Sequence, residues 1–220
     1  MEIENHKEEV PFEHYAGLFA QADAKEMAER TGVEWDGKEF YVNLLGTVYA
    51  IAHPVYGIRV CQEDPTPALA GTPSQEGVLQ GGGHCPLQIQ TFLLRYLLEG
   101  KAVAWGGGWK TFREMPWGEL YIKPYTGRVL TRAAFTFGTR LAAFKAACEK
   151  LGATPVKHGD AGYELALLGD YRMRLLVWEG DDEFPPNAQV LYSDNFENGF
   201  APEDRVVAGD ILISAIKSEM

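Results

Sequence analysis

Apolar residues recur at the helical spacing of three to four in five stretches of the chain. This pattern predicts helices over residues 12–19, 25–31, 86–100 and 139–151, and a final helix that begins at Pro202. Asp23 is followed three residues later by Glu26, a pattern typical of a helix start, and Gly32 is the expected end of that helix. The broad apolar face of the stretch 86–100 predicts a central core helix.

Runs of β-branched and aromatic residues predict strands over 40–45, 47–52 and 56–60, and again over 163–168, 171–178 and 188–192. Gly46 separates the first two runs, either as a bulge in one long strand or as the turn of a tight pair. Gly169 and Asp170 predict a two-residue hairpin turn. Strands and helices do not alternate strictly, so the sequence predicts an α+β fold with a mainly antiparallel sheet covered by helices.

Two segments lie outside this pattern. Residues 1–10 are polar and are expected to be a frayed lead-in to a single domain that spans 1–220. Residues 62–85 are rich in Pro and Gly, include three consecutive glycines at 81–83, and predict an extended loop. Structureless segments of this length inside a domain are usually functional or disordered, and both readings are open here.

Composition and charge narrow the class of protein. A chain of 220 residues with 46% hydrophobic residues has the composition of an ordinary globular domain. The formal charge of −11 argues against nucleic acid and against an anionic membrane surface as partners. Three cysteines, an odd number, favour a reducing compartment, and the charged N-terminus does not resemble a signal peptide. We therefore expect a cytoplasmic protein.

His84 and Cys85 directly precede the predicted core helix. A helix N-terminus and a neighbouring imidazolium both lower the pKa of a thiol, so Cys85 is a candidate nucleophile or metal ligand. The alternative is a small capping residue packed under the loop. The sequence contains no C-x-x-C and no histidines three or four apart, which argues against a zinc or iron–sulfur site held by this chain alone.

Aromatic residues crowd into the segment 105–125, and an acidic turn follows the strand 171–178. Rings on irregular backbone wall pockets for flat ligands, although they also cap cores. We hypothesise that the rings of both segments meet on one face of the sheet and leave a cleft between them. The turn's carboxylates are candidates for cation binding or acid–base chemistry, or they form a solvated hairpin. The candidate ligand-binding residues are His84, Cys85, Trp109, Phe112, Arg113, Glu114, Trp178, Asp181, Asp182, Glu183 and Phe184.

Several segments together resemble the domain of unknown function 3786 (DUF3786) family, uncharacterised proteins mainly of anaerobic bacteria and archaea. They are residues 24–32, 93–97, 109–118, 178–192 and 202–204, of which the WEGDDEFPP segment at 178–186 is the most specific. The resemblance carries no assigned activity. Fusion of some relatives to an iron–sulfur domain implies an accessory role in anaerobic redox or one-carbon metabolism, with a corrinoid or other tetrapyrrole as the cofactor.

Three functions follow from these observations. The first is a binding or accessory protein that holds a small planar or tetrapyrrole-like ligand or docks a redox protein partner. The second is an enzyme with Cys85 as a thiolate nucleophile or with a cation held by Asp181, Asp182 and Glu183. The third is a structural interaction module.

Overall fold

The computed structural model describes residues 6–61 and 85–220. The predictions for residues 1–5, for the segment 62–84 with its triple glycine, and for His84 lie outside the described residues. The predicted α+β class is confirmed, but the strands form two antiparallel sheets rather than one. One sheet has four strands in the order β1-β2-β3-β4, and the other has five in the order β5-β9-β8-β7-β6.

The N-terminal half consists of α1 (His6–Gln21), α2 (Ala24–Thr31), β1 (Glu34–Trp35), β2 (Glu39–Leu44), β3 (Thr47–Ala52), β4 (Gly57–Val60) and α3 (Leu87–Glu99). The cap of α2 is as predicted: the Asp23 carboxylate accepts two backbone N–H groups, and Gly32 takes a left-handed conformation with φ 67°. Strands β2 and β3 are the tight pair, because Leu45 and Gly46 both have positive φ, which suits a two-residue hairpin turn.

Helix α1 begins at His6, inside the stretch 1–10 predicted to be a frayed lead-in. That prediction is wrong for residues 6–10. The helix lies along α3, and Phe12, Tyr15 and Ala16 pack against the buried core. Tertiary packing therefore extends the helix into a polar stretch that would not be helical by itself.

The C-terminal half consists of β5 (Trp109–Thr111), a 3₁₀ turn (Phe112–Glu114), α4 (Gly118–Tyr125), a π-helical segment (Thr126–Thr131), α5 (Arg132–Phe137), α6 (Leu141–Lys150), β6 (Thr154–Pro155), β7 (Ala161–Leu168), β8 (Tyr171–Trp178), β9 (Asn187–Ser193), α7 (Phe196–Gly199) and α8 (Pro202–Ser218). Residues 118–125, predicted to be irregular, are helical. Tyr125, Val129 and Ala133 are buried at a helical spacing of four. The prediction missed this spacing because Pro124 and Gly127, which disfavour helices, lie within it.

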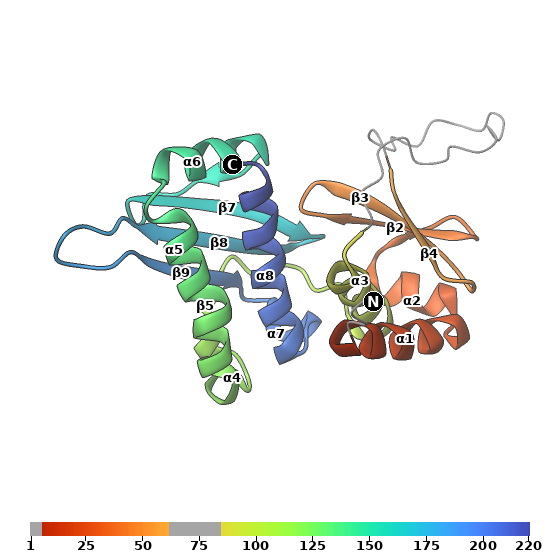
Figure 1. Cartoon of the computed structure of the whole chain (residues 1–220). Coiled ribbons are helices and arrows are strands. Elements are labelled where there is room, and N and C mark those ends of the chain that lie inside the picture. The colour runs from red at the N-terminus through yellow and green to blue at the C-terminus, as the bar shows by residue number, and fades with distance from the viewer. Residues whose placement is uncertain (1–5, 62–84) are drawn as a thin grey trace.

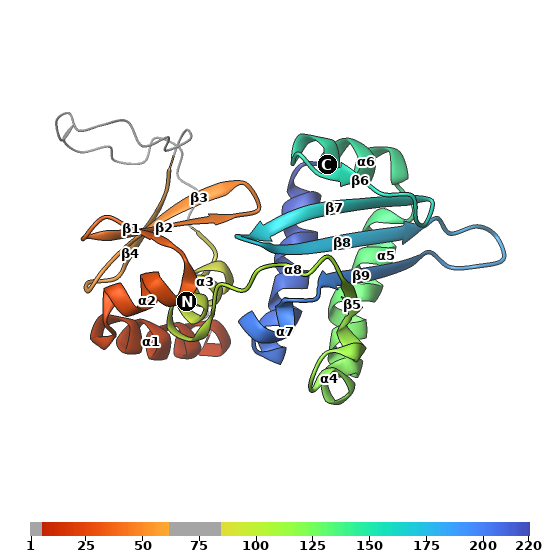
Figure 2. The same cartoon turned by 180° about the vertical axis from the view of Figure 1, so that it is seen from behind.

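Helices α5 and α8 lie across one face of the five-stranded sheet, and the opposite face is turned toward the viewer in Figure 2. The predicted alternation in β8 is confirmed: Met173 and Leu175 are buried on the helix side, whereas Arg172 and Arg174 are half-buried on the other face. The sheet therefore has an inner apolar face and an outer face of mixed character, as is common in antiparallel sheets.

The two halves pack together where α3 meets α8 and where β2 meets β7. Phe200, just before α8, stacks on Phe92 with ring centroids 5.4 Å apart and on Tyr96 at 5.3 Å. A single cluster of buried residues includes members of both halves. Within the described residues, no helix is long and apolar enough to span a membrane.

Candidate functional site

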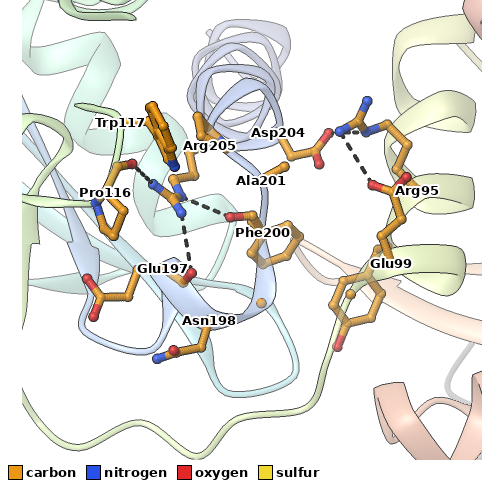
Figure 3. Close-up of a pocket in the computed structure, with 14 residues that line it drawn as sticks. Arg95, Glu99, Pro116, Trp117, Glu197, Asn198, Phe200, Ala201, Asp204 and Arg205 are labelled. Atoms are coloured by element: carbon orange, nitrogen blue, oxygen red, sulfur yellow. Dashed lines mark hydrogen bonds and ion pairs between the residues drawn. The ribbon is translucent and has the colours of Figure 1, made fainter. Parts of the chain in front are cut away.

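A hollow of about 330 Å³ opens between α3 and the α7–α8 corner (Figure 3). We call it the α3–α8 hollow. Arg95 and Glu99 line it from α3, and Pro116 and Trp117 from the loop before α4. Residues 197–202, Asp204 and Arg205 line it from α7 and the start of α8. Its walls thus come from segments far apart in the sequence, and they meet where the two halves of the molecule join. Ligand sites are frequent at such junctions.

The Arg95–Asp204 ion pair forms one wall of the hollow. Arg95 Nε lies 2.7 Å from Asp204 Oδ1, and the two side chains are only 18% and 8% exposed. Arg95 also donates a 2.5 Å hydrogen bond to the Tyr15 hydroxyl. Burial raises the pKa of Asp204 to about 6, although the neighbouring Arg95 guanidinium acts in the opposite direction. A carboxyl group that titrates near neutral pH in a cleft is a functional-site candidate.

Arg205 braces the opposite wall. Its guanidinium donates to the carbonyl oxygens of Pro116 at 2.8 Å, Phe200 at 3.0 Å and Glu197 at 3.3 Å (Figure 3). The Pro116 and Phe200 carbonyls belong to irregular connections, and the Glu197 carbonyl belongs to the four-residue helix α7. Buried backbone carbonyls need donors, so one buried arginine fixes the loop before α4 against α7. The hollow is therefore held in shape before any ligand binds.

Trp117 stands at the mouth of the hollow in a strained backbone conformation. Its φ of 65° lies in the left-handed region that bulky residues rarely adopt, and its side chain is 70% exposed. The following Gly118 passes so close to the Phe112 carbonyl that a Cβ atom there would lie 2.0 Å from the oxygen. Tight packing at Gly118 therefore imposes the turn that presents the indole to solvent. Strain of this kind is concentrated at ligand-binding sites.

Three predicted residues of the aromatic segment, Phe112, Arg113 and Glu114, bind partners within that segment or the helix after it. Phe112 is buried and stacks on Tyr125 with ring centroids 4.0 Å apart. The Glu114 carboxylate accepts the Thr111 N–H at 2.7 Å and closes a capping box. Arg113 is exposed and pairs with Glu119 at 3.0 Å. None of the three lines the α3–α8 hollow.

Trp109 and Trp178 lie on the same face of the five-stranded sheet but do not meet. Trp109 pairs with Ser193 at one end of β9, and Trp178 pairs with Asn187 at the other. Six positions along a strand correspond to roughly 20 Å. The expectation of a cleft between the two aromatic segments is therefore wrong. Phe184, exposed at the turn beyond Trp178, lies still further along the hairpin.

The acidic turn is a hydrogen-bonded hairpin loop. Asp181 Oδ1 accepts the backbone N–H groups of Glu183 at 2.8 Å and Phe184 at 2.7 Å, and these bonds lower the pKa of Asp181. Asp182 and Glu183 are exposed. Across residues 6–61 and 85–220, no group of three or more His, Cys, Asp or Glu side chains is placed to hold a metal ion.

Cys85 is half-buried just before α3, and burial raises the pKa of its thiol to about 11. The sequence predicted a lowered pKa, so the structure reverses that expectation. The reason is that the thiol packs beside the core, where the charged thiolate loses its hydration. At neutral pH Cys85 is therefore a thiol, and its partner in the prediction, His84, lies outside the described residues.

The second triple glycine, at 106–108, surrounds an anion from its own chain. The Asp194 carboxylate accepts the N–H groups of Gly106 at 3.0 Å and Gly108 at 2.9 Å. A Cβ atom at Gly108 would lie 2.6 Å from Asp194 Oδ2. Close approach of the backbone to this carboxylate explains both glycines.

The protein is thus of the α+β class, with two antiparallel sheets and a polar hollow where its two halves meet. The family model for the domain of unknown function DUF3786 matches residues 23–215, so the chain belongs to that family. Comparisons with curated proteins and with solved structures gave no significant match.

Sequence reasoning missed the three residues that shape the hollow most. Arg95 interrupts an apolar run, LLRYLL, and a charged residue on a core helix is a signal for a buried ion pair. Asp204 lies in the first turn of α8, where an acid stabilises a helix start without any role in binding. Trp117 is one of the crowded aromatic residues of the segment 105–125, but it was not among the candidate ligand-binding residues.

Proposed function

We propose that this protein binds a small, planar, polar molecule in the α3–α8 hollow. The observation that carries the proposal is the exposed Trp117 indole at the mouth of a hollow whose far wall is the buried Arg95–Asp204 pair (Figure 3). An indole held outward by its backbone offers a stacking surface that needs no rearrangement, which limits the entropic cost of binding.

The charged groups of the hollow favour a polar ligand without a large net charge. Arg95 and Arg205 provide two cations, and Glu99, Glu197 and Asp204 provide three carboxyl groups. Lys110 neutralises Glu197 at 2.7 Å. Because cations and carboxyl groups nearly balance, an aromatic ring with hydrogen-bonding edges suits the hollow better than a polyanion. The cofactor expected from the family resemblance, a corrinoid or other tetrapyrrole, stays a prediction, and the experiment below includes it.

The proposal is tested by measuring the Tm of the full chain with a panel of planar compounds, among them a purine nucleoside, a flavin, a pterin, haem and cobalamin. A bound ligand raises Tm with its concentration, by linkage. Trp117→Asn removes the indole, and Asn tolerates the left-handed conformation, so this variant should fold as well as the wild type. We expect it to bind at least about tenfold more weakly, a loss in the range of one aromatic stacking contact.

The matched control is Phe184→Asn, because Phe184 is 66% exposed but lies in the hairpin turn beyond β8. It should bind as the wild type does. If no planar compound raises Tm, or if Trp117→Asn binds unchanged, the proposal fails.

A second candidate function is catalysis in the same hollow, with Asp204 as a general acid or base. The observation that favours it is the pKa of about 6 that burial gives Asp204. General acid–base catalysis needs a side chain with a pKa near the working pH, placed close to the ligand. Asp204 would meet both conditions if a ligand stacks on Trp117. Once a ligand is known, turnover that is lost in Asp204→Asn while binding persists would distinguish catalysis from binding alone.

A further inference from the structure

The outer face of the five-stranded sheet carries a cluster of tryptophan and arginine side chains that do not line the α3–α8 hollow. Arg174 Cζ lies 4.0 Å from the centroid of Trp109, and Arg172 Cζ lies 5.1 Å from that of Trp105. The two indoles contact each other edge to face at 5.3 Å. All four side chains are half-buried, and Figure 2 shows this face toward the viewer with α5 and α8 behind it. We call these four residues the Trp–Arg cluster.

The order of these side chains follows from the strand register. Arg174 pairs across the sheet with Glu164 on β7 and with Leu191 on β9, and Trp109 on the neighbouring β5 pairs with Ser193. Regular pairing of β5, β9 and β8 places Trp109, Arg172 and Arg174 on one face of the sheet, and the Trp105 indole, which precedes β5, packs edge to face on that of Trp109. Trp and Arg are among the residue types most enriched at the energetic centres of protein–protein interfaces.

The cluster has a surplus of positive charge. Glu164 is the only carboxylate that pairs with these arginines in the described residues, at 3.3 Å from Arg172 and 2.9 Å from Arg174. Two cations therefore share one anion. The surplus stands out in a chain with a formal charge of −11. Arg172 Nε and Nη2 and Arg174 Nη1 make no hydrogen bond within the parts of the chain that the structure covers.

We propose that the Trp–Arg cluster docks an acidic segment of a partner protein, with carboxylates on Arg172 and Arg174 and apolar side chains on the indoles. Charge complementarity selects this occupant, since a carboxylate matches the free edges of the guanidiniums in a charge-assisted pair. The acidic chain as a whole repels a polyanion such as nucleic acid, whose binding needs many phosphate contacts. A short acidic segment is attracted by the local excess of positive charge at Arg172 and Arg174. Repulsion from more distant carboxylates is weak, because charges beyond about 10 Å are screened at ordinary ionic strength.

The probe is a fluorescein-labelled peptide, Glu-Glu-Phe-Glu-Glu-Leu-Glu, compared with the same peptide carrying Gln in place of every Glu. Fluorescence anisotropy with the full chain gives both affinities. We expect the acidic peptide to bind at least about tenfold more tightly, the contribution of one charge-assisted hydrogen bond. The double variant Arg172→Gln/Arg174→Gln should remove this difference. Arg59→Gln, which breaks a comparable cross-strand pair with Glu39 on the other sheet, should leave it intact.

A second measurement does not depend on the variants folding. In wild-type protein labelled with ¹⁵N at tryptophan, the acidic peptide should shift the indole signals of Trp105 and Trp109 and leave that of Trp35 in place, since Trp35 belongs to β1 of the other sheet. Equal affinity for the two peptides, or unshifted Trp105 and Trp109 signals, would overturn the proposal. Tighter binding of oligothymidylate than of the acidic peptide would also overturn it, because the face would then bind nucleic acid. A dimer of this chain in sedimentation that the double arginine variant abolishes would overturn it as well, because the face would then be covered by a second copy.

Discussion

Buried charge is the feature of single residues that most distinguishes this protein. Asp204, Arg205 and Asp210 are each at most 6% exposed, and all lie on α8. Each has partners from elsewhere in the chain: Arg95 for Asp204, backbone carbonyls for Arg205, and Arg132 and Gln88 for Asp210. Burying a charge is costly unless it is paired, so these contacts determine where α8 sits against the rest of the molecule.

Asp204→Asn should change how stability depends on pH. Because burial raises the pKa of Asp204 from 3.8 to about 6, its stabilising contribution is complete below the ordinary pKa and is lost as pH rises toward 6. The free energy of unfolding of the wild type, minus that of the variant, should therefore fall by up to about 3 kcal/mol across that range. Urea unfolding of both proteins at each pH measures it. A difference that is flat or rises with pH would mean that attraction to Arg95 outweighs burial.

At the scale of elements, short connections are fixed by side chains that replace missing backbone partners. The loop 106–108 closes around Asp194 at the end of β9, Arg205 holds the loop before α4, and Arg30 donates to the carbonyls at the end of α3. Glu114 closes the 3₁₀ turn after β5. Side-chain hydrogen bonds therefore fix these irregular segments where backbone partners are missing.

Gly108→Ala should destabilise the protein by about 1–3 kcal/mol, because the new Cβ would displace the Asp194 carboxylate from two backbone N–H groups. Gly127→Ala is the matched control, since nothing lies within 4 Å of its Cβ position. It should be neutral or stabilising by up to about 1 kcal/mol, the helix preference of Ala over Gly. In an Asp194→Ala background the cost of Gly108→Ala should shrink, and a fully additive double-mutant cycle would show that the carboxylate is not the cause.

At the scale of the whole molecule, the aromatic stack of Phe200 with Phe92 and Tyr96 joins the halves. The turn between β2 and β3 adds a second contact, where the Leu45 N–H donates to the Leu167 carbonyl of β7 at 2.8 Å. The buried cluster runs through this junction. The α3–α8 hollow is bounded by the same stack, so its shape depends on how the halves are held together.

Phe200→Ala should lower the free energy of unfolding by about 3–5 kcal/mol, the usual cost of removing a buried Phe. We expect a single unfolding transition in urea, seen alike by tryptophan fluorescence and by circular dichroism, because the halves share a core. Phe184→Ala, at an exposed phenylalanine, should change stability by less than about 0.5 kcal/mol. Two separate transitions in the wild type would contradict a shared core.

Much of the local structure was predictable, and the candidate site was not. Helices α2, α3, α6 and α8 and the hairpin β7–β8 lie close to their predicted positions, because hydrophobic spacing and turn residues act over a few neighbours. Residues 118–137 escaped prediction because a proline and a π-helical segment interrupt the spacing. The predicted cleft failed because strand register, which no local pattern encodes, puts Trp109 and Trp178 at opposite ends of β9.

The amino-acid sequence by itself determined the α+β class, most helices and strands, and the family to which the chain belongs. Tertiary structure alone decided that the strands divide into two sheets, that Cys85 packs where its thiol stays protonated, and that Arg95, Trp117 and Asp204 surround one hollow. The physical reason is range. Backbone preferences and hydrophobic periodicity act between neighbours, whereas burial, ion pairing and pKa depend on contacts between residues about 20 to 110 positions apart, which exist only once the core has packed.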